Sequence, residues 1–117
     1  LEDGLYVVGD NLKDAAFKDK MVRFVRASMK GWKYAETNQA EAAEIVVNND
    51  DSGAQTIDHN TTQMGEIAKL TAGSNGSLSE TDFNRTVNSL MTGGSDPVIT
   101  KKPVGAWSHA ITDAALN

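Results

Sequence analysis

The amino-acid sequence predicts a mostly α-helical chain with one short β-strand near its start. Apolar residues recur every three or four positions over long stretches, which is the period of a helix with one buried face. Residues 4–8 differ, because they are apolar and β-rich and glycines bound them, as in a strand buried on both faces. The hydrophobic fraction of 39% over 117 residues is enough for a core, so we expect a folded chain.

About five helices are expected after this strand, with no internal repeat and no domain boundary, so residues 1–117 read as a single segment. The first spans residues 17–37. Its predicted apolar face is made of seven residues: Phe17, Met21, Phe24, Val25, Ser28, Trp32 and Ala35. The second spans about 38–47, and Asn38 with Glu41 resembles a capping box at its start.

The remaining three helices are marked by end signals. The third spans about residues 56–71. Ser79 opens the fourth, and Gly93 and Gly94 end it. Residues 95–105 are expected to be extended, and a last short helix is expected over about 106–115.

Composition and motif content argue against an enzyme. The chain has no cysteine, no G-x-S-x-G elbow and only two histidines, His59 and His109. We therefore predict no catalytic residues, no metal site and no cofactor. No apolar run approaches the roughly 20 residues of a membrane-spanning helix. The net charge of −5 argues against a general nucleic-acid binder.

Two loops resemble ligand-binding motifs only in part. Asn48, Asp50 and Ser52 have the spacing that starts an EF-hand calcium loop, but its twelfth position is His59 where a glutamate is needed. We interpret this stretch as a solvated turn. Residues 73–76 could cradle an anion before a helix, yet they lack the phosphate-loop pattern, so a plain interhelical loop is expected.

Four cations on the first helix suggest an alternative function. Arg23, Arg26, Lys30 and Lys33, here called the basic stripe, recur at helical spacing on the side opposite the predicted apolar face. Such a stripe is typical of a solvated helix surface, but it could also meet phosphates. A small helical interaction or nucleic-acid-binding module is therefore the alternative to the function described next.

Three stretches of the chain resemble one known family. They are Gly4-Leu-Tyr-Val-Val-Gly-Asp10, Val22-Arg-Phe-Val-Arg-Ala-Ser-Met-Lys-Gly-Trp-Lys-Tyr-Ala35 and Asn38-Gln-Ala-Glu-Ala-Ala43. They resemble the C-terminal third of the NMT1/THI5-like binding proteins of nitrate/sulfonate/taurine and thiamine-precursor transport. The residues 78–90 and the closing Lys102-Pro-Val-Gly-Ala-Trp107 also fit this family.

The resemblance implies a fold, a location and a function. The fold would be the C-terminal fragment of an α/β type II periplasmic-binding protein, with its upstream lobes absent from this chain. The whole protein would bind a small solute in the periplasm and deliver it to an ABC transporter permease, without chemistry.

Tyr6, on the expected hinge strand, is the only candidate ligand contact, but core packing is the favoured role for it because the strand is apolar. Trp32 is expected in the core. The chain by itself is expected to self-associate, because its strand lacks a partner.

Overall fold

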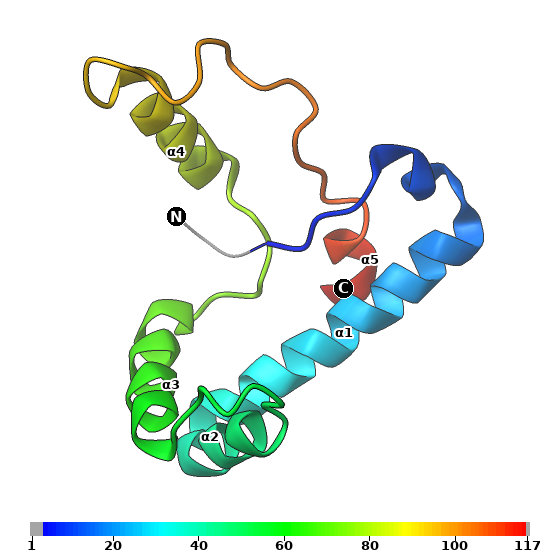
Figure 1. Cartoon of the computed structure of the whole chain (residues 1–117). Helices are drawn as coiled ribbons and strands as arrows, with labels where there is room; N and C mark the ends of the chain where they lie inside the picture. Colours follow the sequence, from blue (N-terminus) through cyan, green and yellow to red (C-terminus); the bar gives the residue numbers. More distant parts are fainter. Residues whose placement is uncertain (1–3, 117) are drawn as a thin grey trace. The chain divides into compact units, whose positions relative to one another are not determined.

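The computed structural model of the chain describes residues 4–116 and is mostly helical. A 3-10 helix, η1 (Gly9–Lys13), precedes the long helix α1 (Ala15–Thr37). The helices α2 (Gln39–Asn48), α3 (Ile57–Thr71), α4 (Glu80–Thr92) and α5 (Thr112–Leu116) follow (Figure 1). The chain divides into two compact units, Arg23–Gly76 and the remaining residues, so the border falls within α1.

The predicted strand does not form, and no strand is present between residues 4 and 116. Residues 4–8 are extended and exposed, with φ −67° and ψ 122° at Val8, and the Val8 carbonyl accepts a hydrogen bond from Asn11 N–H at 3.0 Å. A strand needs a neighbouring strand to pair its backbone groups. The described part of the chain supplies none, so β propensity produces only an extended segment.

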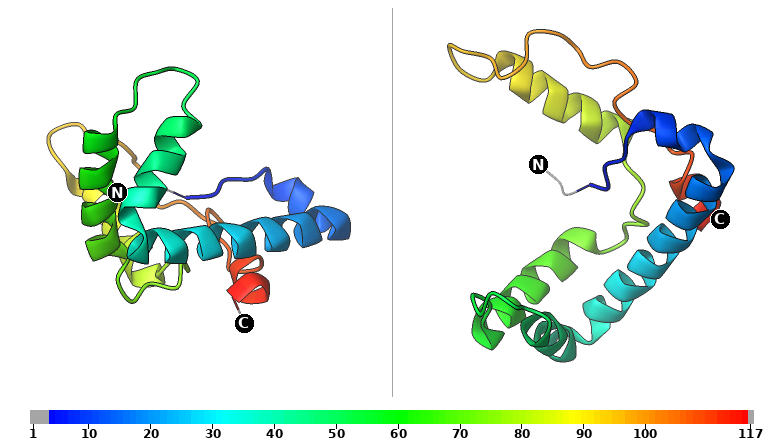
Figure 2. Two further views of the ribbon diagram at one scale, coloured as in Figure 1. Left: turned by 90° about the horizontal axis from the view of Figure 1, so that it is seen from below. Right: turned by 45° about the vertical axis from the view of Figure 1, so that its right-hand side comes forward.

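In the unit Arg23–Gly76, α2 and α3 lie side by side as a helical hairpin (Figure 2). Small residues allow this approach: Ala43 is fully buried, and a Cβ on Gly65 would lie only 3.6 Å from Gln39 Oε1. Asn60 is also buried, and its amide donates to Gln55 Oε1 at 2.9 Å and to the Thr56 carbonyl at 3.0 Å. The buried amide is therefore satisfied locally.

The capping box predicted at the start of α2 does not form. Asn38 precedes the helix, but its side chain makes no cap hydrogen bond. Instead its amide donates back to the Tyr34 carbonyl at 2.9 Å and to Thr37 Oγ1 at 3.0 Å. The Glu41 carboxylate accepts a hydrogen bond from the Tyr34 hydroxyl. The end of α1 thus uses both side chains that the capping box would have needed.

In the other unit, α4 begins and ends as predicted. The Ser79 hydroxyl accepts from Asp82 N–H at 3.3 Å at its start, and Gly93 N–H donates to the Ser89 carbonyl at 2.8 Å at its end. Val87 is the buried apolar residue of this helix.

The predicted last helix is too long, because helical structure begins only at Thr112. Three contacts hold the preceding residues in a non-helical path. The Trp107 ring lies 6.0 Å from Phe83 and 4.8 Å from His109, measured between centroids, and His109 Nε2 is 2.7 Å from the Leu78 carbonyl oxygen. Ser108 Oγ accepts from Ala110 N–H at 3.1 Å, which favours a turn over a helix.

Candidate functional site

Tyr6, the candidate ligand contact for which core packing was the favoured role, lies in the extended segment before η1. Its side chain is 88% exposed, so core packing does not occupy the ring. A Cβ on Gly4 would lie 3.4 Å from the Tyr6 ring, which therefore covers the backbone of Gly4. An exposed aromatic ring with a hydroxyl can stack on a solute and hydrogen-bond to it.

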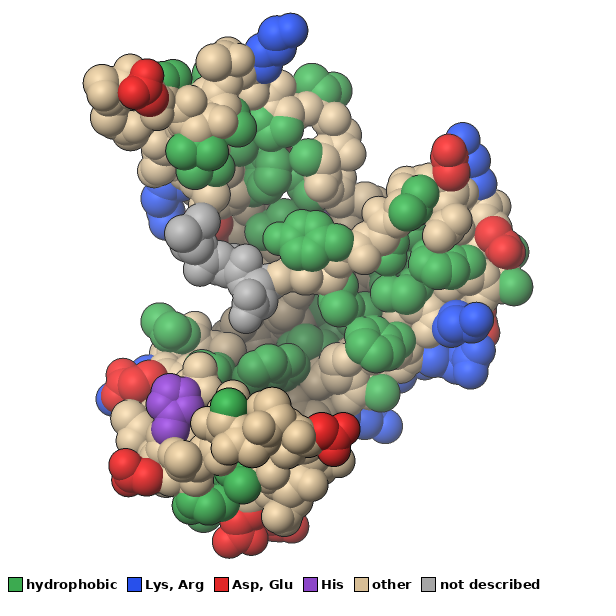
Figure 3. Space-filling model, in the orientation of Figure 1, with side chains coloured by type: hydrophobic (Ala, Val, Ile, Leu, Met, Phe, Trp, Pro, Cys, Tyr) green, Lys and Arg blue, Asp and Glu red, His purple; other side chains and the backbone are tan. Residues whose placement is uncertain are grey.

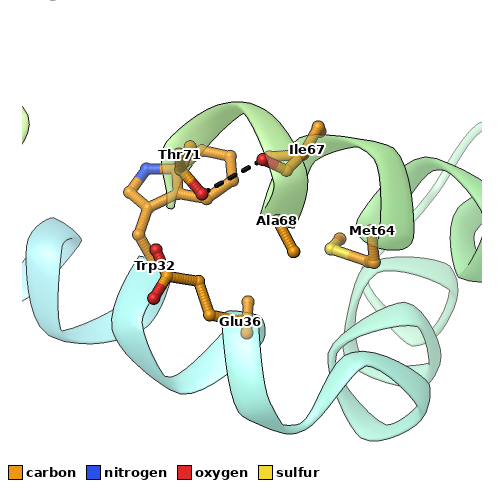
Figure 4. Close-up of a pocket in the computed structure, with 7 residues that line it drawn as sticks. Trp32, Glu36, Met64, Ile67, Ala68 and Thr71 are labelled. Carbon is orange, nitrogen blue, oxygen red and sulfur yellow. Dashed lines mark hydrogen bonds between the residues drawn. The ribbon is translucent and has the colours of Figure 1, made fainter. Parts of the chain in front are cut away.

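A shallow apolar depression lies between α1 and α3, within the unit Arg23–Gly76. Its cavity volume is about 10 Å³, roughly the space that one water molecule needs and far below that of a ligand pocket. It is lined by seven residues: Trp32, Ala35, Glu36, Met64, Ile67, Ala68 and Thr71. Figure 4 shows the Trp32 ring beside Thr71, whose hydroxyl donates to the Ile67 carbonyl at 3.1 Å.

The apolar face predicted for α1 is only partly buried. Val25 is 8% exposed, but Phe24 is 52% exposed and Trp32 45% exposed. Trp32 therefore lies at a partly open edge of the α1–α3 contact, which corrects its expected place in the core. Phe24 lies about 100° around the helix from Val25, and its side is not covered.

The basic stripe is exposed, as predicted. Arg23, Arg26, Lys30 and Lys33 are all exposed on α1. Lys33 Nζ is 3.2 Å from the Glu36 carboxylate, while its side chain stays 81% exposed. Such exposed pairs contribute about 0–1 kcal/mol, so the stripe keeps its cationic character.

The EF-hand-like stretch uses its central carboxylate for local hydrogen bonds. Asp50 Oδ1 accepts from the Ser52 hydroxyl at 2.5 Å and from Ser52 N–H at 2.9 Å, and Oδ2 accepts from Gln55 N–H at 2.7 Å. The Ser52 hydroxyl and then the Gln55 N–H hold the pKa of Asp50 below its usual value. This is the turn that we predicted from the missing glutamate.

No group of three His, Asp or Glu side chains that could hold a metal ion occurs within residues 4–116. No helix in the same range is long and apolar enough to cross a membrane. In the glycine loop, Gly76 N–H donates to Ser74 Oγ at 3.1 Å and Ser74 N–H to the Thr71 carbonyl at 2.8 Å. These two backbone N–H groups therefore donate to oxygens of the loop and of the end of α3.

Nothing in the sequence pattern predicts the hydrogen bond between Tyr34 and Glu41. The hydroxyl of Tyr34 donates to the Glu41 carboxylate across the junction of α1 and α2. This hydrogen bond, followed by burial and the carboxylate charge, raises the pKa of Tyr34. Because the two residues are seven positions apart and lie in different helices, helical periodicity does not predict that they meet.

Comparison of the chain with protein-family models, curated proteins and solved structures gave no match. The assignment of a function therefore depends on the resemblance of the three stretches and on the geometry described above.

Proposed function

We propose that the chain is the C-terminal segment of a solute-binding component of an ABC import system. The intact protein would capture a small molecule of the nitrate, sulfonate, taurine or thiamine-precursor class in the periplasm and deliver it to a membrane permease. Its fold would be the two-lobed type II periplasmic-binding fold. The stretches around Tyr6, Trp32 and Asn38 carry the resemblance on which this proposal is based.

The exposed apolar segment at residues 4–8 is the structural observation that supports this proposal most directly. Leu5 is 59% exposed, Tyr6 88% and Val8 67%. Their apolar and aromatic side chains are of the kind that a strand normally buries against a neighbour. Hydrophobic side chains also reach the surface elsewhere, and Figure 3 shows many of them on one face. Contiguous exposed apolar residues mark surfaces that another part of a protein covers. Upstream lobes with a sheet would cover them here.

The proposed mechanism is binding without bond chemistry. A solute that binds between two lobes favours their closed arrangement by the difference in its affinity for the two states. The permease then distinguishes the closed from the open protein. In this chain Tyr6 is the proposed ligand contact, because its ring and hydroxyl are both available.

A thermal-shift screen of the intact gene product tests this function. The ligands are taurine and other sulfonates, nitrate, pyrimidines and vitamins, each at fixed protein concentration. A solute at 100 times its Kd stabilises the folded protein against unfolding by about 2.7 kcal/mol. This raises Tm by roughly 5–10 °C in a protein of this kind. The Tyr6→Ala variant should reduce this shift, whereas the exposed Val104→Ala should not.

Calorimetry on the 117-residue chain alone is the second part of this test. A cleft needs both of its walls, so we expect the isolated chain to bind the same solute weakly or not at all. Micromolar binding by the isolated chain would contradict the proposal. So would an intact protein that no solute stabilises, and this second outcome would favour the interaction or nucleic-acid module instead.

A further inference from the structure

Helix α1 has two parallel strips of exposed residues between positions 23 and 34. The first is the basic stripe, at positions 23, 26, 30 and 33. With 100° per residue these four positions fall within about 80° of arc and extend over about 15 Å of helix. The second, which we call the aromatic strip, consists of Phe24, Ala27, Gly31 and Tyr34, all of them exposed. It occupies the neighbouring 80° of the same helix.

The opposite side of α1 is the one that packs within the protein. Val25 is buried, and Met21, Val22, Ser28 and Met29 are half-buried. The two strips are therefore the face that α1 presents to its surroundings. Phe24 is 52% exposed and Tyr34 43% exposed, and both rings lie on the same side of the basic stripe, with Tyr34 the nearer of the two.

The charge of α1 contrasts with the charge of the chain. The helix carries six cations and two carboxylates, a net charge of +4, whereas the whole chain has a net charge of −5. Arg23 and Arg26 also interact within the chain, and Lys33 pairs with Glu36. Glu41, at the start of α2, faces Tyr34 through its hydrogen bond. The basic stripe is thus a local cationic surface in a chain that is otherwise acidic, and an anionic partner would complement it.

We propose that this face of α1 binds the surface of an anionic phospholipid bilayer. Basic residues beside exposed aromatic rings on one convex helix face are typical of helices that lie in a membrane interface. Single-stranded nucleic acid is instead bound in grooves lined by aromatic rings, and the two strips form a ridge. The inference is independent of the proposed transport function.

Co-sedimentation of the full 117-residue chain with lipid vesicles tests the proposal. One set of vesicles is pure phosphatidylcholine, and the other contains about one third phosphatidylglycerol. We expect binding to the anionic vesicles only. Raising the salt concentration from 0.05 to about 0.5 M shortens the screening length from above 10 Å to below 8 Å, so most of the binding should be lost.

Two double variants, each of which removes two positive charges, locate the interaction. Each basic residue at an anionic surface strengthens binding roughly fivefold, so Lys30→Gln with Lys33→Gln should weaken it about 30-fold. Lys101→Gln with Lys102→Gln changes the net charge equally at exposed loop positions, and it should weaken binding less than threefold. Glutamine has nearly the helix propensity of lysine, and circular dichroism checks that the helix content is unchanged.

Phe24→Ala provides a variant that leaves the charge unaltered. It should weaken vesicle binding severalfold while leaving its salt dependence in place, because only the apolar contribution is removed. Equal losses for the two lysine pairs would overturn the proposal, and so would equal binding to neutral vesicles. Binding to a single-stranded oligonucleotide that is stronger than vesicle binding, and that Lys30→Gln with Lys33→Gln removes, would assign the face to nucleic acid instead.

Discussion

Replacement of Gly76 by alanine tests how the loop between α3 and α4 is packed. Gly76 has φ +80°, and a left-handed backbone costs a residue with a Cβ roughly 1–2 kcal/mol. A Cβ there would also lie 2.5 Å from Met29 Sδ and 2.8 Å from Met29 Cε, so the methionine must leave its rotamer at a further cost of roughly 0.5–1.5 kcal/mol. We expect Gly76→Ala to reduce the free energy of unfolding by about 2–3 kcal/mol.

Gly73→Ala is the matched control for this prediction. Gly73 has φ +77°, but its added Cβ would meet nothing within 4 Å, so only the backbone cost of roughly 1–2 kcal/mol applies. Urea unfolding followed by circular dichroism measures both variants, and the double variant Gly76→Ala with Met29→Ala should recover part of the difference. Equal stability of Gly76→Ala and Gly73→Ala would refute the Met29 contact. No destabilisation by either would refute the left-handed backbone.

Three further predictions concern pH and association. The pKa of Tyr34 is raised in the folded chain, so the stabilising hydrogen bond to Glu41 is fully present below pH 10 and is lost as the pH rises through the folded pKa; Tyr34→Phe should remove this alkaline step in a denaturation–pH series. The pKa of Asp50 is lowered, so its contribution is present above the unfolded pKa of 3.8 and is lost as the pH falls through the folded value. Asp50→Asn should abolish that acid dependence, and an unchanged profile would contradict the role of the turn. The exposed apolar segment at residues 4–8 should make the chain self-associate, and Leu5→Lys should shift light scattering toward the monomer with helix content unchanged; a wild-type monomer at high concentration would rule this out.

The sequence predicted most of the helices because their signals are local. The periodicity over residues 17–37 predicted α1 within two residues at its start, and the end of α1 agreed. Ser79 and Gly93 predicted the two ends of α4. The Ser79 hydroxyl and the Gly93 N–H each make a hydrogen bond to a residue within about one helical turn, so no distant partner is needed. The turn at Asp50 was also predictable, because an aspartate that accepts hydrogen bonds from the following residues needs no distant partner.

The failed predictions all depended on groups distant in sequence or on competition between neighbours. Residues 4–8 have strand propensity, but a strand exists only where a second chain segment pairs with it. Asn38 and Glu41 match a capping box, but Tyr34 competes for both side chains. Residues 106–111 have no strong helix breaker after Gly105, and it is the contact of Trp107 with Phe83 that selects the non-helical path.

The sequence by itself thus determined the positions of α1–α4, the turn at Asp50 and the cationic character of one helix face, because periodicity and capping operate within a few residues. Only the tertiary structure decided which apolar residues are buried. Val25 packs inside while Phe24 stays exposed, although both fit the predicted apolar face. The physical reason is that burial requires a partner surface, and one helix can bury only the arc that a neighbouring element covers.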